Sequence, residues 1–210
     1  MASSIPLPAV ARLCTLYQVL CDLNESGQQR VSSSALGEIL GVGAHNVRKD
    51  ISYLGETASA GGGYNVINLI ELIALRMGFN REKVTCVVGL GHLGSAILHH
   101  ERFRGGEFKI VAGFDSNINL IETMHSGVNL FPAYEITETV KKMHIELAIL
   151  TVPSSGAQEV AQRLIDGGIE GIINFTPVVI KAPSSVLVRN VDLTGEFRVL
   201  SALLHLRENN

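Results

Sequence analysis

The sequence predicts an α/β protein with three parts. An N-terminal winged helix-turn-helix domain (residues 1–80) precedes a doubly wound parallel sheet (residues 81–190) and a C-terminal helix (residues 191–210). Three observations carry this prediction. A glycine-rich turn directly follows an apolar, β-branched run, strands alternate with helices after it, and two short helices near the N-terminus meet at a glycine turn.

Composition limits the class of protein. The chain has 210 residues, 46% of them hydrophobic, and a formal net charge of −3, which suits one sizeable core and a small second domain. No apolar run approaches the ~20 residues of a membrane helix, and residues 1–14 lack a signal-peptide pattern, so a cytoplasmic protein is expected. The cysteines Cys14, Cys21 and Cys86 lack zinc or disulfide spacing, and no histidine pattern predicts a metal site.

Residues 84–100, VTCVVGLGHLGSAILHH, combine a buried strand, a G-x-G-x-x-G turn and the start of a helix. Gly89 would allow the tight turn, Gly91 would let a pyrophosphate approach the backbone, and Gly94 would let the helix pack on the strand. The start of the helix offers free N–H groups to the phosphates. The predicted contacts are Gly89, Leu90, Gly91, His92, Leu93 and Gly94.

A second strand is predicted over 108–114, with Asp115 and Ser116 at its end. An acid roughly 20 or more residues past the first glycine can accept hydrogen bonds from an adenosine ribose. No arginine follows closely to hold a 2′-phosphate, so NAD(H) is favoured over NADP(H). The alternative is a structural glycine turn beside a surface aspartate.

The remaining strands are predicted over 146–152, 171–175 and 185–191, with helices over 117–125, 134–143 and 157–165. Ligands of such sheets bind beyond the carboxyl ends of the strands. The strand ends expected to line the nicotinamide half of the site are Thr151, Val152, Pro153, Asn174, Phe175, Thr176 and Pro177.

The N-terminal part predicts helices over 8–23, 35–40, 44–54 and 66–77, with a polar turn over 24–30. Serines 32–34 supply N-caps, and the third helix would turn Val47, Ile51 and Leu54 inward. Residues 55–64, GETASAGGGY, would form the hairpin of a wing. The third helix has polar side chains off its apolar stripe that could reach the major groove of DNA, namely His45, Asn46, Arg48, Lys49 and Ser52.

Charge in this part is unusual for a DNA-binding domain, which commonly presents a basic patch. Residues 1–80 hold five basic and six acidic residues, and only Arg48 and Lys49 form a local basic pair. A three-helix protein-interaction module therefore remains an alternative.

Two further features bear on function. The segment 192–207 is more apolar than a terminal helix needs, which favours docking on a second subunit over capping its own sheet. A dehydrogenase would need a further lobe to bind substrate, whereas the sheet and its helices already use residues 83–191. A nucleotide-reading protein without catalytic residues is predicted, and a small NAD-dependent oxidoreductase with an interaction domain is the alternative.

Over essentially its full length the chain resembles the bacterial redox-sensing transcriptional repressors of the Rex family. The stretches that carry the resemblance are Arg12-Leu13, Arg30-Val31-Ser32-Ser33, Val47-Arg48-Lys49-Asp50-Ile51-Ser52-Tyr53, Gly63-Tyr64-Asn65-Val66, Gly89-Leu90-Gly91-His92-Leu93-Gly94, Phe114-Asp115, Ile149-Leu150-Thr151-Val152-Pro153, Gly171-Ile172-Ile173-Asn174-Phe175-Thr176-Pro177 and Val191-Asp192-Leu193.

The resemblance implies a homodimer that binds an inverted-repeat operator when NAD⁺ dominates and releases it when NADH binds. It implies a C-terminal helix swapped between subunits, Arg48 and Lys49 on DNA, and Arg12 with Asp192 in an interdomain contact. The same resemblance extends the DNA-binding set to Ser33, Tyr53, Gly63 and Tyr64.

Two positions depart from the family pattern. The family's wings are usually basic, whereas residues 58–63 hold no Lys or Arg, so DNA binding would be weaker or depend more on Arg48 and Lys49. The family often has a tyrosine in the interdomain contact where this chain has His100. Because histidine changes charge near neutral pH, the coupling is predicted to be pH-sensitive. A regulator that keeps the nucleotide only for its structure remains a third possibility.

Overall fold

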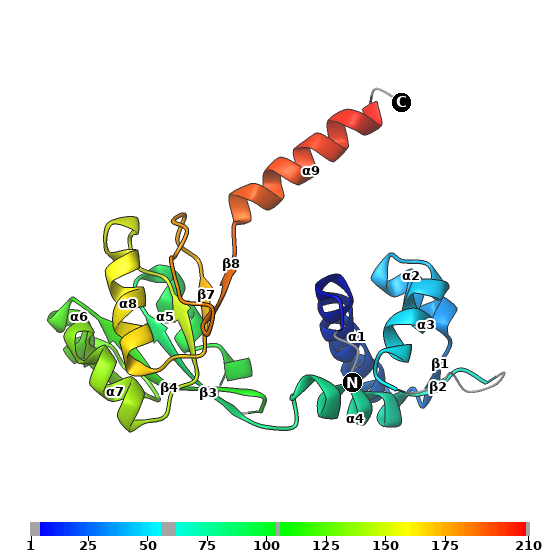
Figure 1. Ribbon diagram of the computed structural model, residues 1–210, viewed down its shortest axis with the longest axis horizontal. Helices are drawn as coiled ribbons and strands as arrows, with labels where there is room; N and C mark the ends of the chain where they lie inside the picture. Colours follow the sequence, from blue (N-terminus) through cyan, green and yellow to red (C-terminus); the bar gives the residue numbers. More distant parts are fainter. Residues whose placement is uncertain (1–4, 56–61, 104–105, 209–210) are drawn as a thin grey trace. The chain divides into compact units, whose positions relative to one another are not determined.

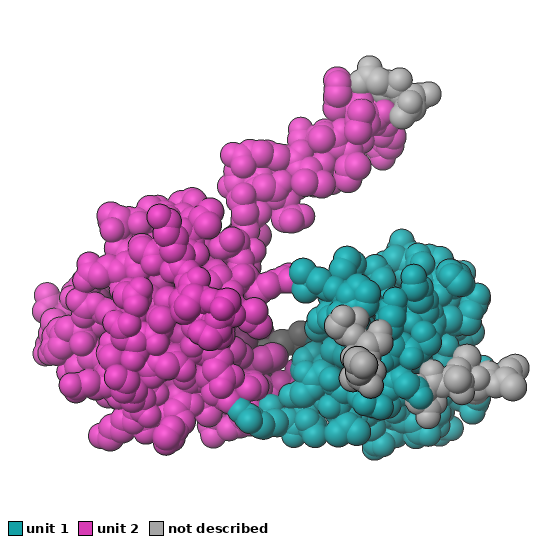
Figure 2. Space-filling model, viewed as in Figure 1, with its two compact units in different colours: residues 1–81 teal, residues 82–210 magenta. Residues whose placement is uncertain are grey.

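The computed structural model describes residues 5–55, 62–103 and 106–208. They belong to two compact units, residues 1–81 and residues 82–210 (Figure 2). Within the described ranges, no helix has both the length and the apolar character needed to cross a bilayer.

Four helices build the first unit. Their apolar stripes meet in one core, in which Leu13, Leu36, Val47, Ile51 and Ile73 are almost completely buried. The inward positions predicted for the third helix, Val47, Ile51 and Leu54, are confirmed. The helices are α1 (Leu7–Glu25), α2 (Ser33–Leu40), α3 (Ala44–Ser52) and α4 (Val66–Met77) (Figure 1).

A two-stranded antiparallel sheet forms the base of the wing. Strand β1 (Arg30–Val31) pairs with β2 (Tyr64–Asn65), so that Arg30 faces Asn65 and Val31 faces Tyr64. The partner of β2 thus comes from before α2, where the sequence predicts a polar turn ending at Arg30. Most of the hairpin predicted over 55–64 falls on residues 56–61, which lie outside the described residues.

The second unit is built on a six-stranded parallel sheet with the order β5-β4-β3-β6-β7-β8. The chain runs outward from β3 in one direction and from β6 in the other, so a topological switch point lies between these two strands. The sequence predicts no strand over 129–132, where the structure has β5. The strands are β3 (Lys83–Val88), β4 (Phe108–Asp115), β5 (Asn129–Pro132), β6 (Leu147–Leu150), β7 (Gly171–Asn174) and β8 (Leu187–Asn190).

Helices cover both faces of this sheet (Figure 1). The larger core packs α7 and α8 against side chains such as Cys86, Phe114 and Ala148. The smaller core packs α5 and α6 against Val87, Ile110 and Ile149. The alternation of strands and helices confirms the predicted doubly wound architecture. The helices are α5 (His92–Leu98), α6 (Ile118–Thr123), α7 (Ile136–Lys142) and α8 (Ala157–Gly167), with short 3₁₀ turns η1 (Glu101–Phe103), η2 (Ala133–Glu135) and η3 (Ser154–Gly156).

None of the residues of the last helix, α9 (Leu193–Glu208), is buried within the described part of the chain. Asp192 precedes it and accepts a hydrogen bond from the backbone N–H of Gly195, 2.9 Å away, which caps the first turn. Its large apolar side chains are between 42% and 74% exposed, namely Leu193, Phe197, Val199, Leu200, Leu203, Leu204 and Leu206.

Candidate nucleotide-binding and DNA-binding sites

The glycine loop lies at the switch point of the sheet, between the end of β3 and the start of α5. Gly89 has φ +94°, and a Cβ there would lie 2.8 Å from the carbonyl group of Thr151. A Cβ on Gly94 would overlap the carbonyl oxygen of Gly89. Close backbone packing therefore requires glycine at both positions. This agrees with the tight turn predicted at Gly89 and with the packing of helix on strand predicted at Gly94.

Gly91, the N-cap residue of α5, is different. A Cβ on this residue would meet no atom of the described chain within 4 Å. Packing within the chain therefore gives no reason for a glycine there, whereas the approach of a bulky group such as a pyrophosphate does.

Asp115 ends β4 and holds the glycine loop in place. Its Oδ2 accepts a hydrogen bond from the N–H of Leu90 at 2.7 Å, and its Oδ1 accepts one from the N–H of Asn117 at 2.8 Å. A carboxylate offers about four acceptor positions, so this half-buried group retains capacity for ribose hydroxyls. The N–H of Leu90 is already used by Asp115 and is not free for a phosphate here.

Thr151 follows β6 and joins it to the loop. Its Oγ1 lies 2.7 Å from the carbonyl oxygen of Gly89 and 3.0 Å from that of Val88, and its single hydroxyl proton can be donated to one of them at a time. The predicted site residues from β3 and β6 are thus brought together at one edge of the sheet.

Asn174 has a structural role in this structure. Its side-chain amide donates to the carbonyl oxygen of Val178 at 2.8 Å and to Oδ1 of Asn190 at 2.9 Å, while its Oδ1 accepts from the N–H and the hydroxyl of Thr176. Asn174 and Thr176 are 0% and 7% exposed. They fix the segment 175–186, which joins β7 to β8 without a helix.

The other predicted nucleotide contacts divide by exposure. Leu90 is buried, and Val152 and Phe175 are half-buried. The side chains that solvent reaches at this edge are those of His92, Leu93, Ser116, Pro153 and Pro177. Over the described ranges, no group of three or more His, Cys, Asp or Glu residues could hold a metal ion.

In the first unit, α2 and α3 form the helix-turn-helix. Ser32 caps α2 by accepting a hydrogen bond from the N–H of Ala35 at 3.1 Å, and Gly41 ends that helix in the left-handed region. Gly37 lets the turn fold back on the helix, since a Cβ there would lie 2.6 Å from the carbonyl oxygen of Val42. The side chains that α3 leaves exposed are the predicted ones, namely His45, Asn46, Arg48, Lys49 and Ser52.

Arg48 connects α3 to the beginning of α2. Its Nη1 donates a hydrogen bond to Oγ of Ser33 at 2.9 Å. Burial raises the pKa of Tyr64, an effect that the charge of Arg48 partly offsets, so the phenol stays protonated and can donate a hydrogen bond. Arg48, Ser33 and Tyr64 together present a cation and two hydroxyl groups, which suits a phosphate. Of the other predicted contacts, Ser52 bonds the carbonyl oxygen of Lys49, and Tyr53 is half-buried.

Arg30 is not among the residues that the sequence predicts to contact DNA, although it lies in one of the stretches that resemble the Rex family. Its Nε donates to the carbonyl oxygen of Gly62 at 2.8 Å and its Nη2 to that of Gly63 at 2.9 Å. Gly63, predicted to contact DNA, also has a structural reason to be glycine, because its φ is +70° and a Cβ would lie 2.7 Å from the carbonyl oxygen of Val31. The pairing of β1 with β2 brings Arg30 here, and no local pattern indicates it.

Asp50 is a buried residue of α3 to which the sequence pattern assigns no role. It is 3% exposed and accepts two hydrogen bonds from Arg12, at 2.6 Å from Nε and 2.8 Å from Nη2. These hydrogen bonds raise the pKa of Arg12. The helical spacing of Asp50 with Val47 and Leu54 could have placed it on the inward face.

His100, predicted to take part in the interdomain contact, lies edge-on against the ring of Phe103, with ring centroids 6.1 Å apart.

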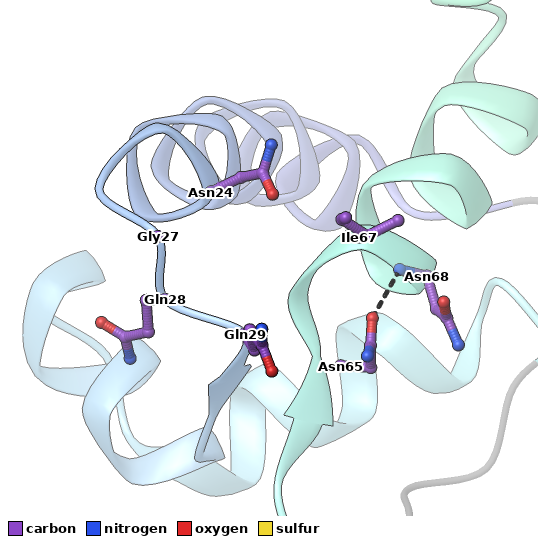
Figure 3. Close-up of a pocket in the computed structure, with 7 residues that line it drawn as sticks. All are labelled: Asn24, Gly27, Gln28, Gln29, Asn65, Ile67 and Asn68. Atoms are coloured by element: carbon purple, nitrogen blue, oxygen red, sulfur yellow. Dashed lines mark hydrogen bonds between the residues drawn. The ribbon is translucent and has the colours of Figure 1, made fainter.

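A hollow of about 390 Å³ lies between the end of α1 and the start of α4 (Figure 3). Carboxamide side chains and Ile67 dominate its lining, and Asn65 accepts a hydrogen bond from the N–H of Asn68 at 3.0 Å. Its lining residues carry no charge, so it does not suit a phosphate group. The lining residues are Asn24, Gly27, Gln28, Gln29, Asn65, Ile67 and Asn68.

Comparison with known protein families agrees with this two-part description. Residues 4–52 match the family described as putative DNA-binding protein N-terminus. Residues 80–178 match the CoA binding domain family. The first match contains the helix-turn-helix, and the second contains the glycine loop and Asp115.

Relatives match nearly the whole chain. The redox-sensing transcriptional repressor Rex 1 of Enterococcus faecalis is 35% identical over 201 residues, covering 96% of this chain and 93% of its own length. The repressor Rex of Lactobacillus gasseri is 37% identical over 196 residues, covering 93% and 92%.

Solved structures of a Rex-family repressor, RSP, are similar over 98% of this chain at 29% identity. The TM-score is 0.89 for RSP with NAD⁺ and operator DNA, where 95% of that chain is covered, and 0.86 for RSP with NADH, where 97% is covered. The relatives are named as repressors and not as enzymes. The chain therefore belongs to the family of redox-sensing transcriptional repressors, Rex, and is a regulator of transcription.

Proposed function

We propose that this protein represses transcription in the cytoplasm by binding operator DNA as a homodimer, and that binding of NADH releases it from the DNA. NAD⁺ is the nucleotide compatible with the DNA-bound state. RSP, similar over almost the full chain, has been solved with NAD⁺ and operator DNA and also with NADH. The proposed operator is an inverted repeat, because a two-fold symmetric dimer presents two equivalent recognition helices.

One observation carries this proposal. The same chain holds a glycine loop at a switch point, with Gly91 open on its outer side, and a helix-turn-helix whose Arg48 is fixed beside the start of α2. The first arrangement fits a dinucleotide, and the second fits the backbone of a DNA duplex. No catalytic residue is required by either.

The predicted contacts divide into roles. Gly91, Asp115 and the exposed residues near them are proposed to contact NAD(H). Leu90, Asn174 and Thr176 are proposed to shape the site from beneath, because their side chains are buried. On the DNA side, Arg48, Ser33 and Tyr64 are proposed to hold a phosphate. Lys49, whose exposed side-chain ammonium group forms no ion pair among the described residues, is proposed to reach the bases.

Communication between the two functions needs a ligand that binds one state of the protein better than the other. We propose that Arg12, His100 and Asp192 take part in this coupling and that α9 is exchanged between subunits. Arg12 is well placed to act on DNA binding, because its partner Asp50 lies in α3. If His100 contributes, NADH-driven release should differ between pH 6 and pH 8, and equal release at both values would remove His100 from the coupling.

The test is binding of the full chain to an inverted-repeat duplex, followed by fluorescence anisotropy at fixed salt. The duplex is one that the wild-type chain selects from a randomised pool. NADH and NAD⁺ are titrated separately while the absorbance of NADH is monitored. Release by NADH and not by NAD⁺, without consumption of NADH, is expected. Binding that is indifferent to both nucleotides would contradict the proposal, and steady consumption of NADH would indicate an enzyme.

A further inference from the structure

We infer that Arg30, at the base of the wing, contacts a DNA phosphate and supplies the positive charge that the wing itself lacks. This inference rests on the proposed function. It assigns a further DNA-binding residue outside the helix-turn-helix.

The first argument is positional. Arg30 lies in β1, and its guanidinium group reaches across to the chain that leads into β2, where the carbonyl oxygens of Gly62 and Gly63 accept from Nε and Nη2. A Cβ on Gly62 would lie 2.8 Å from Nη2, so the guanidinium packs directly on this backbone. The two hydrogen bonds fix the orientation of a side chain that would otherwise be highly mobile.

The second argument concerns the donors that remain. A guanidinium group has five N–H donors, and the two carbonyl oxygens use two of them. Among the residues that the structure describes, Arg30 has no carboxylate within ion-pair distance, and its Nη1 has no hydrogen-bond partner. The residue is exposed. A fixed, exposed and unneutralised guanidinium suits a phosphate oxygen.

The third argument is the chemistry of its neighbours. Arg30 and Tyr64 line the same hollow, of about 290 Å³, beside β2 and the end of α3. The positive charge of Arg48 acts on the phenol group of Tyr64. Arg48 also donates a hydrogen bond to Ser33 at the start of α2. Arg30, Tyr64, Arg48 and Ser33 therefore form one series of hydrogen-bond donors and cations from the wing base to α2, as a DNA backbone requires.

The sequence of the wing explains why Arg30 matters. Between Gly55 and Asn65 the only charged residue is Glu56. The paired strands β1 and β2 carry a single charge, that of Arg30. A wing contact with the negatively charged DNA backbone must therefore draw its cation from Arg30.

The test compares Arg30→Gln, Arg30→Lys and the control Arg76→Gln in the full chain. Arg76 is an exposed residue of α4, so its substitution removes the same charge from the same unit at a residue outside the paired strands β1 and β2. Affinity for the selected operator duplex is measured over a series of KCl concentrations. Each variant is also checked for unchanged NADH binding and thermal unfolding.

For Arg30→Gln we expect roughly tenfold weaker binding. The slope of log K against log salt should fall by about 1.8, since a dimer loses two phosphate contacts at about 0.9 each. Arg30→Lys keeps the charge and should keep the slope, with a smaller loss of affinity. Arg76→Gln should match the wild type in both.

Two results would overturn the inference. Weaker binding of Arg30→Gln with the wild-type slope would mean that Arg30 only braces the wing. Unchanged affinity and slope would mean that the wing base does not meet DNA. Failure of the proposed function is a separate result, because the wild-type chain itself would then select no duplex.

Discussion

Two glycines of the loop between β3 and α5 lack a side chain for different physical reasons. Gly94 has no room for one, because a Cβ would overlap the carbonyl oxygen of Gly89 and lie 2.8 Å from Oγ1 of Thr151. Gly91 has ample room. Substitution by alanine therefore separates packing from ligand binding.

We expect Gly94→Ala to destabilise the second unit by roughly 1–3 kcal/mol or more, because both obstructing atoms belong to well-packed elements. Gly91→Ala should unfold at nearly the wild-type temperature but bind NADH at least about tenfold more weakly, a loss of ~1.4 kcal/mol. Thermal unfolding and NADH fluorescence measure the two effects. Wild-type NADH affinity in Gly91→Ala would contradict the approach of a pyrophosphate at this residue.

The stability of the folded protein should depend on pH because of Cys86, in the middle of β3. Burial raises the pKa of its thiol, so the folded protein keeps Cys86 neutral where the unfolded chain ionises it. Its contribution to stability is therefore present below the ordinary thiol pKa of about 8.5 and is lost as the pH rises above it. The slope for one such group is about 1.4 kcal/mol per pH unit.

Denaturant unfolding at pH 8, 9 and 10 measures this slope. In Cys86→Ala the free energy of unfolding should fall less steeply with pH, by up to about 1.4 kcal/mol per pH unit. This difference in slope is independent of how much the substitution destabilises the protein at one pH. Parallel curves for the variant and the wild type would show that Cys86 ionises equally in both states. Native Cys86 should also resist thiol reagents, because its thiol is buried and stays protonated.

Asp50 shows what sequence reasoning could not provide at this scale. Its place on the inward face of α3 follows from helical spacing, but its partner Arg12 is 38 residues away. Only the packing of α1 against α3 brings the two together, and this packing depends on side chains throughout the first unit. The same holds for Arg30, whose carbonyl partners Gly62 and Gly63 are 32 and 33 residues away.

At the scale of elements, the ion pair between Arg12 and Asp50 joins α1 to the proposed recognition helix α3. Removing Arg12 alone would leave a carboxylate with 5% side-chain exposure without its cation, which is strongly destabilising. We therefore expect Arg12→Met to lower the unfolding temperature and to weaken operator binding, with NADH binding unchanged. Replacing both residues, Arg12→Met with Asp50→Leu, should restore most of the stability, as apolar replacements of buried pairs often do.

Calorimetry measures the thermal stability of the single and double variants, and fluorescence anisotropy measures their operator binding. If the double variant regains stability but not NADH-driven release, Arg12 acts in the coupling as well as in the fold. Equal loss of stability in the single and double variants would mean that the ion pair is not the source of the effect.

The elements that sequence reasoning predicts best are those with a long periodic pattern. The helix predicted over 66–77 has these bounds in the structure, and the strands from 84, 108 and 171 begin within one residue of the predicted positions. Strand β5 was missed because Asn129–Pro132 has four residues, ends in proline and carries no alternation. Strand β1 was missed because its two residues form a strand only through pairing with β2.

At the scale of the whole molecule, one chain has a single recognition helix, so a second copy of the chain has to provide the other. A single recognition helix reads one half-site, and an inverted-repeat operator needs two, fixed at a set spacing. The exposed apolar residues of α9 are the natural means of fixing them, because such a surface is unfavourable in water.

We expect the double substitution Leu200→Asp with Leu204→Asp to yield a monomer, because it places two charges on one apolar face of α9. Ala202→Asp, on a different face of the same exposed helix, is the matched control and should remain dimeric. Light scattering after gel filtration gives the mass. The monomer should retain NADH binding, because all the proposed NAD(H) contacts lie in the second unit of one chain. Its affinity for the two-site operator should fall towards that for a single half-site. A monomeric variant with full operator affinity would contradict the homodimer as the DNA-binding form, and a variant that stays dimeric would place the subunit contact elsewhere than on α9.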